Sequence, residues 1–180
     1  MNPIEDLTAT ARIMNGLLGQ LRPQEHAALP TPNAGWTVHD LVVHICENPF
    51  SFLTWAGADT SPPADGPPTA RYTEAIERLV AAYSAPGMLE KPLPTPFGDL
   101  SGGPVLAVCF ADQLTHVWDL SRALGVPVDV PDELAETALA VWQGFITDGL
   151  RDAGAFGKAE EPGPDAGPLD RLAAFTGRSL

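Results

Sequence analysis

Apolar residues recur at three- and four-residue steps along most of this chain, a spacing that places them on one face of a helix. Few segments alternate apolar and polar residues in the way that half-buried strands do. The pattern predicts helices at 3–21, 37–57, 69–85, 103–125 and 131–150, and a short helix at 168–176. Segments rich in Pro and Gly connect them, as expected for turns and loops between helices.

Three local signals refine these expectations. Thr37 is a good N-cap and Asp40 follows three residues later, close to a capping box, so the second helix should begin here. Pro49 lies inside the same segment and should either kink the helix or mark a join between two pieces. The segment PLPTPFG at 92–98 could pair as a short strand or simply cross the end of a helical bundle.

Short connections between amphipathic helices favour an antiparallel bundle. We therefore expect an all-α fold with four core helices and a fifth helix packed outside them. A single domain should span 1–180, with a helical core at about 3–148. The C-terminal tail, 149–180, is expected to be loop-rich and to hold the short last helix.

The charge balance narrows the range of partners. The chain has 10 Lys and Arg residues against 23 Asp and Glu residues, a formal net charge of −13, which repels phosphate backbones and anionic lipid headgroups. We therefore expect no nucleic acid and no membrane as partners, and either a monomer or a homodimer. No apolar run approaches the roughly 20 residues of a membrane span, and the acidic N-terminus does not resemble a signal peptide. Two cysteines form no disulfide framework, which favours the cytoplasm.

The segment DQLTHVWD at 112–119 carries the clearest candidate chemistry. Asp112 and His116 stand four residues apart, so they point the same way from neighbouring turns of a helix. One helix can in this way offer a carboxylate and an imidazole to one divalent metal ion. His44 is the best candidate for a third ligand, because an unpaired imidazole among the apolar residues of its helix would be costly. An exposed ion pair between Asp112 and His116, or a histidine satisfied within the core, would account for the same spacing without a metal.

Other residues near this segment have open roles. Cys109 shares the helical face of Asp112 and could ligate a metal, although a small buried residue is the more common role of such a cysteine. Asp119 could orient His116, or it could pair with Arg122 at a three-residue spacing, and we favour the pair with Arg122. Glu47 could act as a base near the site or be an ordinary solvated acid. The four tryptophans are expected mostly in the core by their spacing.

Three separated segments resemble the actinobacterial branch of the DinB-like proteins. One is PTPNAGWTVHDLVVHI, which is similar to their pattern PTPC-x-GW-x-V-x-DL-x-x-H. The second is DQLTHVWDLSRALGVPV, which is similar to D-x-x-x-H-x-WDL-x-R-A-x-G, and the third is the ending GAFGKAEEPGPDAGPLDRLAAFTGR. The resemblance implies a DinB-like four-helix bundle with an additional C-terminal helix, as in the metal-binding domain of mycothiol-dependent maleylpyruvate isomerase.

The resemblance also implies a divalent metal held by His44, Asp112 and His116, where the isomerase has a Glu in place of Asp112. Zinc is the expected ion, and nickel or another divalent ion would suit the same ligands. An open metal position would activate a thiol, with mycothiol as the cosubstrate and a small electrophile as the other partner, in a transferase or isomerase reaction. A metal-binding or ligand-sensing protein without catalysis is the alternative. Asn33 replaces the Cys of the family pattern, and the further domain of the isomerase is not expected here.

Overall fold

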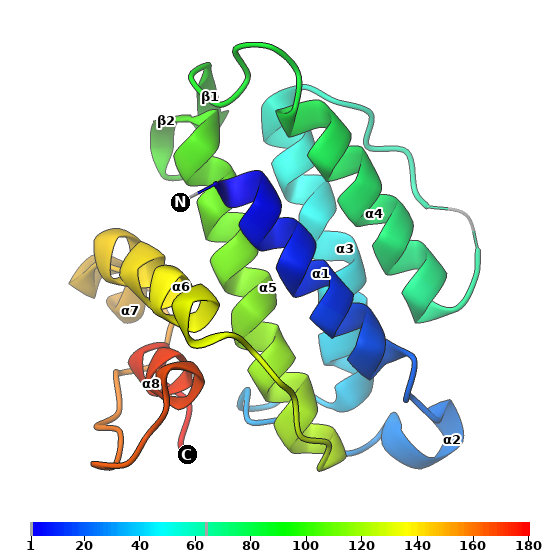
Figure 1. Ribbon diagram of the computed structural model, residues 1–180, viewed down its shortest axis with the longest axis vertical. Helices are drawn as coiled ribbons and strands as arrows, with labels where there is room; N and C mark the ends of the chain where they lie inside the picture. Colours follow the sequence, from blue (N-terminus) through cyan, green and yellow to red (C-terminus); the bar gives the residue numbers. More distant parts are fainter. Residues whose placement is uncertain (1, 64) are drawn as a thin grey trace.

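The computed structural model describes residues 2–63 and 65–180 and is built mainly of helices (Figure 1). The elements in chain order are α1 Pro3–Leu18, α2 Pro23–His26, α3 Val38–Ala56, α4 Pro68–Tyr83, β1 Pro92–Thr95, β2 Gly98–Ser101, α5 Gly102–Leu124, α6 Asp132–Phe145, α7 Asp148–Asp152 and α8 Pro168–Phe175.

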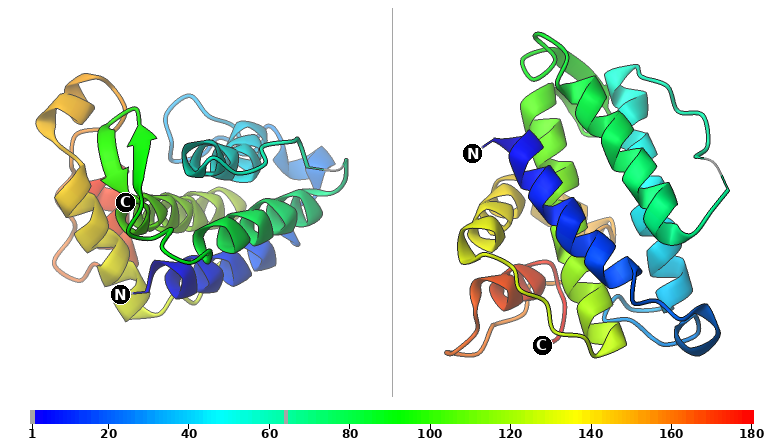
Figure 2. Two further views of the ribbon diagram at one scale, coloured as in Figure 1. Left: turned by 90° about the horizontal axis from the view of Figure 1, so that it is seen from above. Right: turned by 45° about the vertical axis from the view of Figure 1, so that its right-hand side comes forward.

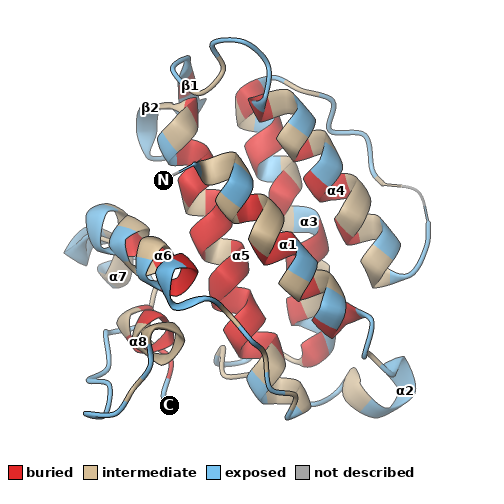
Figure 3. Ribbon diagram, viewed as in Figure 1, coloured by how far each residue is buried: buried red, intermediate tan, exposed pale blue. Residues whose placement is uncertain are grey.

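Four long helices form the bundle that the periodicity predicts. Helix α1 packs against α4 and α5, and α3 also packs against α4 and α5, so the four close into a ring of neighbours. Helix α5 additionally contacts α6 and α8 on its other side, and it is buried along most of its length (Figure 3). The protein is therefore an all-α, DinB-like bundle in which α5 is the central element.

The helix boundaries differ from the predictions in places where a cap decides them. The first helix ends at Leu18 rather than at residue 21, and Gly19 caps it. The predicted helix at 131–150 is interrupted, because Ile146 is extended and the Thr147 side chain accepts a hydrogen bond from the Leu150 amide to start α7. Periodicity alone does not detect such a break, since the apolar spacing continues across it.

Helix α3 begins as its capping signal predicts. The Thr37 side chain accepts from the Asp40 amide and the Asp40 carboxylate accepts from the Thr37 amide, which completes the capping box. The helix then runs as one element through Pro49, so this proline does not divide it into two pieces. Pro49 has no amide hydrogen, so the Ile45 carbonyl lacks its usual helical partner at this point.

The segment at 92–101 forms a small antiparallel hairpin, which decides between the two alternatives for PLPTPFG. Leu93 pairs with Leu100 and Thr95 pairs with Gly98. Viewed from above, the hairpin stands beside the start of α5, into which β2 leads directly (Figure 2). The hairpin contacts α3 and α5 and covers one end of the bundle.

The C-terminal segments lie against α5 on the side away from α4 (Figure 1). Helix α8 packs on both α5 and α6, and its residues Leu172, Ala173 and Ala174 are buried. Within the described ranges, none of the helices combines the length and the apolar character that a membrane crossing requires.

Candidate metal centre

Three side chains from two helices converge beside the centre of the bundle. His44 comes from α3, and Asp112 and His116 come from consecutive turns of α5. One ligand atom from each residue lies within 4.8 Å of the other two, and we call this group the His–Asp–His cluster. Helical spacing aligns the two residues of α5, and the packing of α3 on α5 brings His44 to them.

The distances within the cluster fit a shared ion better than direct hydrogen bonds. His116 Nε2 lies 3.4 Å from Asp112 Oδ1, and His44 Nε2 lies 3.6 Å from Asp112 Oδ2. Both are longer than the roughly 2.7–3.2 Å of a good N–H···O hydrogen bond. Ligands about 2.1 Å from a tetrahedral zinc ion stand about 3.4 Å apart. The two separations are close to this value but involve different oxygens of Asp112, and the three candidate ligand atoms lie within 4.8 Å of one another, so the side chains would draw together around an ion.

His44 supplies a second observation in favour of an ion. Its Nε2 atom is buried and has no hydrogen-bond partner among the described residues. A buried polar atom without a partner is costly, and a metal ion at the centre of the cluster would satisfy it. The ring of Trp36 approaches His44 edge-on at 5.0 Å and stacks on His116 at 6.2 Å, so this tryptophan covers the cluster instead of joining the core.

His116 is oriented by a chain of buried polar groups. Its Nδ1 lies 2.9 Å from Asp119 Oδ2, which leaves Nε2 to face the cluster. Asp119 is fully buried and accepts from Arg178, with Nη2 to Oδ2 at 2.8 Å and Nε to Oδ1 at 3.1 Å. A carboxylate behind a metal-binding histidine fixes its tautomer, and Arg178 balances the charge of that carboxylate.

Asp112 is held from the neighbouring helix. Asn48, one turn after His44 on α3, donates from Nδ2 to Asp112 Oδ2 at 2.8 Å. Burial alone would raise the pKa of Asp112, but the imidazoles of His116 and His44 lower that pKa well below the usual range. The shorter acid is therefore ionised and fixed in place, as a metal ligand needs to be.

The same charges act on His116. Burial alone would lower its pKa, yet the carboxylates of Asp112 and Asp119 more than offset this and raise the pKa to about 9. Without a metal, this imidazole therefore holds a proton at neutral pH. Because Nδ1 already faces Asp119, a metal ion and a proton would compete for Nε2.

A cavity of about 500 Å³ opens directly on the cluster. One wall is the loop before α3, which contributes Pro32, Asn33, Ala34 and Trp36; the opposite wall comes from the C-terminal segments at 154–157 and 176–178. Its volume lies within the range of small-molecule sites. The tail that the sequence predicts as loop-rich is thus part of the candidate site.

Two glycines let these C-terminal segments meet. A Cβ atom on Gly177 would stand 2.5 Å from the Cα of Gly157, and Gly177 also has φ +92°, where other residues are strained. The two backbones therefore pack against each other without side chains. This contact places Arg178, the next residue, beside Asp119.

The structure decides several roles that the sequence leaves open. Cys109 is fully buried, and burial raises the pKa of its thiol well above the ordinary value, so it lies outside the His–Asp–His cluster as a core residue. Glu47 is exposed, lies 3.4 Å from Arg71 and is not a member of the His–Asp–His cluster, although it lines a neighbouring cavity together with His44 and Asn48. Asn48, Trp36 and Arg178 are parts of the site that the sequence reasoning missed.

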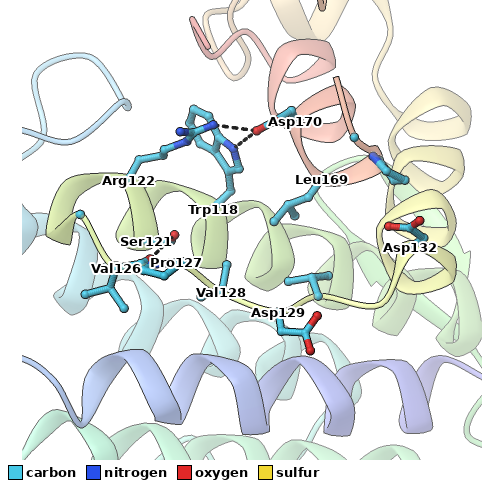
Figure 4. Close-up of a pocket in the computed structure, with 14 residues that line it drawn as sticks. Trp118, Ser121, Arg122, Val126, Pro127, Val128, Asp129, Asp132, Leu169 and Asp170 are labelled. Carbon is cyan, nitrogen blue, oxygen red and sulfur yellow. Dashed lines mark hydrogen bonds and ion pairs between the residues drawn. The ribbon is translucent and has the colours of Figure 1, made fainter. Parts of the chain in front are cut away.

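The favoured pairing of Asp119 with Arg122 is wrong. Arg122 instead lies 2.9 Å from Asp170 of α8, which also accepts from Trp118 Nε1 at 2.7 Å. These side chains line a second cavity of about 560 Å³ between α5 and α8, shown in Figure 4. Arg122, Trp118 and Asp170 satisfy one another there, and these contacts anchor α8 on α5.

Comparisons with known proteins find sequences similar to most of this chain. The family described as the mycothiol maleylpyruvate isomerase N-terminal domain matches residues 7–94, which include His44. Two Mycobacterium tuberculosis proteins from different strains, the uncharacterized proteins MT0763 and Rv0738, are 33% identical to the chain over 154 residues. Those matches cover 84% of this chain and 84% of each relative. No solved structure matches the chain significantly.

Proposed function

Because the chain belongs to the family of the mycothiol maleylpyruvate isomerase N-terminal domain, we propose that it binds one divalent metal ion through His44, Asp112 and His116. The function is a thiol-dependent transfer or isomerisation on a small electrophile, with mycothiol as the thiol and the cytoplasm as the place of action. The observation that carries the proposal is the convergence of three candidate ligand atoms. One of them, His44 Nε2, is buried and has no hydrogen-bond partner among the described residues. Zinc is the expected ion because two imidazoles and one carboxylate suit it well.

The chain leaves room for a further ligand on the ion. Three protein ligands leave a fourth tetrahedral position, which is the arrangement of catalytic rather than structural zinc. The cavity of about 500 Å³ is lined by all three proposed ligand residues, so a further ligand of the ion would have access from it. A bound divalent ion would lower the pKa of an incoming thiol and so supply a nucleophilic sulfur at neutral pH.

The protein's own residues hold this arrangement rigid. Asn48 fixes the carboxylate of Asp112, and Asp119 fixes the imidazole of His116. Trp36 lies over both imidazoles and limits the access of water to them. None of these residues has to act as a general base, because the thiol proton can leave to solvent through the cavity.

The test begins with metal content. Protein purified without a metal-affinity tag should contain about one divalent ion per chain by elemental analysis, and His116→Ala should lose most of it because two ligands hold zinc poorly. His26→Gln is the matched control, since His26 lies on α2 and outside the cluster. Full metal content in His116→Ala would refute the proposed ligand set.

Turnover is measured next, with and without metal and with and without mycothiol. Conversion of an electrophile that needs both components would support the enzymatic function. Stoichiometric metal with no turnover of any electrophile would contradict it and leave a metal-binding module.

A further inference from the structure

The cavity beside the His–Asp–His cluster has aromatic walls. Trp36, Trp142 and Phe156 line it; Trp36 and Phe156 are half-buried, and Trp142 is buried. Phe156 packs edge-on against Trp142 at 5.1 Å, and the indole nitrogen of Trp142 donates to Thr115. The polar end of Trp142 is thus satisfied, and flat apolar surface remains on the loop before α3 and on the C-terminal segment.

The cavity offers no free positive charge. Of its described lining residues, Arg178 is the sole Lys or Arg, and all three of its guanidinium nitrogens are engaged, with Asp119 and with the Thr176 carbonyl. Arg151 lies outside the lining and donates to the carbonyls of Gly157 and Phe175. Lys158 follows the lining residue Gly157, is exposed and lies outside the lining.

The positive charge of a bound divalent ion would also be neutralised by its ligands. A divalent ion carries two positive charges; Asp112 offsets one, and the thiolate of the proposed function offsets the other. A carboxylate on the second substrate would therefore enter the cavity without a cation to pair with, which is costly for a desolvated charge.

Resting on the proposed function, we infer that this cavity takes an uncharged aromatic electrophile rather than a dicarboxylate. Maleylpyruvate, the substrate in the family's name, carries two carboxylates and is a poor match for these walls. An aromatic ring can stack on the faces of Trp36 and Phe156. Phe156 is the residue that determines this preference from the tail side.

The binding test uses two unreactive probes, methyl 4-nitrobenzoate and 4-nitrobenzoate, which share the nitrophenyl ring and differ in the charge of the carboxyl group and by the methyl group of the ester. Calorimetric titration of the zinc-loaded protein saturated with mycothiol, whose thiolate offsets the remaining charge of the ion, should show the ester binding at least about tenfold more tightly. Equal or tighter binding of the carboxylate would overturn the inference, and so would an ester that does not bind at millimolar concentration.

Two charge variants test whether a residue that lines the cavity, rather than a nearby exposed residue, sets the preference between the two probes. Phe156→Arg introduces a cation at the wall, so it should shift the preference at least about tenfold toward the carboxylate. Lys158→Ala is the control, and it should leave the ratio of the two affinities unchanged. A ratio that falls in Lys158→Ala and is unmoved in Phe156→Arg would overturn the assignment. Thermal unfolding of each variant verifies that it is folded. If Phe156→Arg is not folded, Phe156→Ala takes its place, and it should weaken binding of the ester but not of the carboxylate.

A kinetic comparison distinguishes failure of this inference from failure of the proposed function on which it rests. Mycothiol is offered methyl 4-chloro-3,5-dinitrobenzoate or the free acid; sulfur forms a bond to the ring carbon, chloride leaves with the C–Cl electron pair, and the thiol proton goes to solvent. Metal-dependent turnover that prefers the ester supports both proposals. Metal-dependent turnover that prefers the acid or maleylpyruvate leaves the proposed function intact and overturns the inference. Ester-selective binding without metal or turnover supports the selectivity of the cavity and overturns the proposed function.

Discussion

The affinity for metal should depend on pH in a way that reports the environment of His116. In the metal-free protein, burial opposes the charged imidazole, but the carboxylates of Asp112 and Asp119 raise its pKa to about 9. Because Nδ1 faces Asp119, the proton that a metal must displace is on Nε2. At pH 7, two units below this pKa, only about one metal-free molecule in a hundred has the imidazole neutral. The apparent zinc affinity should therefore rise about tenfold per pH unit and level off near pH 9, about 100-fold above its value at pH 7.

The measurement is a competition titration against a chelating indicator from pH 6 to 9.5 at constant ionic strength. Calorimetry in buffers of different ionisation enthalpy should show about one proton released per ion at pH 7.5. Asp119→Asn removes one of the carboxylates, so its plateau should begin at lower pH. An affinity that levels off near pH 6.5, as for an ordinary histidine, would refute this account of the site.

The stability of the metal-free protein should also depend on this proton, but it should fall as the pH rises, whereas the affinity for metal increases. The folded pKa of His116 lies above the unfolded value of 6.5, so protonation stabilises the metal-free fold fully below pH 6.5. This contribution, at most about 3 kcal/mol, should disappear as the pH rises through about 9. Denaturant unfolding in chelator should show the loss, and the zinc-loaded protein should not, because its Nε2 carries no proton.

Three further outcomes are expected. Asp112→Asn should lower metal content, because an amide oxygen is a poorer zinc ligand than a carboxylate, whereas Asp112→Glu should retain it; equal metal content in Asp112→Asn and the parent would place Asp112 outside the site. Arg178→Ala should cost about 3–5 kcal/mol by leaving the buried Asp119 without its cation, measured by denaturant unfolding, and a loss below about 1 kcal/mol would contradict the role given to this pair. Gel-shift experiments at low salt should show no duplex DNA binding, since the net charge is −13, and a tight complex would contradict the electrostatic argument.

The bundle could be predicted because its signal is local. The apolar faces of α1, α3, α4 and α5 repeat at helical spacing, and Thr37 with Asp40 marks a start that sequence alone identifies. Asp112 and His116 were paired by the same regularity. His44 was assigned to them through its apolar surroundings, and the structure brings its Nε2 within reach of both.

The remaining parts of the site depend on contacts between distant segments. Asp119 has a potential partner three residues away on either side, His116 and Arg122, and spacing alone cannot choose between them. Arg178, which decides the matter, lies 59 residues away, and Asp170 draws Arg122 to α8 from a separation of 48 residues. The spacing of the tryptophans predicts that Trp36 is a core residue, and spacing cannot distinguish a tryptophan that covers a site from one that fills a core.

The route of the chain between α7 and α8 has a consequence for proteolysis. Residues 157–165 are exposed throughout, whereas Arg178 beyond them is buried against Asp119. A single cleavage in this exposed stretch would leave α8 and Arg178 attached only by noncovalent contacts. A ligand that requires the closed arrangement would hold the cut piece in place, by about 2.7 kcal/mol at a concentration 100 times its dissociation constant. Because the proposed ligands His44, Asp112 and His116 all precede the cut, a metal ion would help to retain the C-terminal piece through Asp119, which contacts both His116 and Arg178.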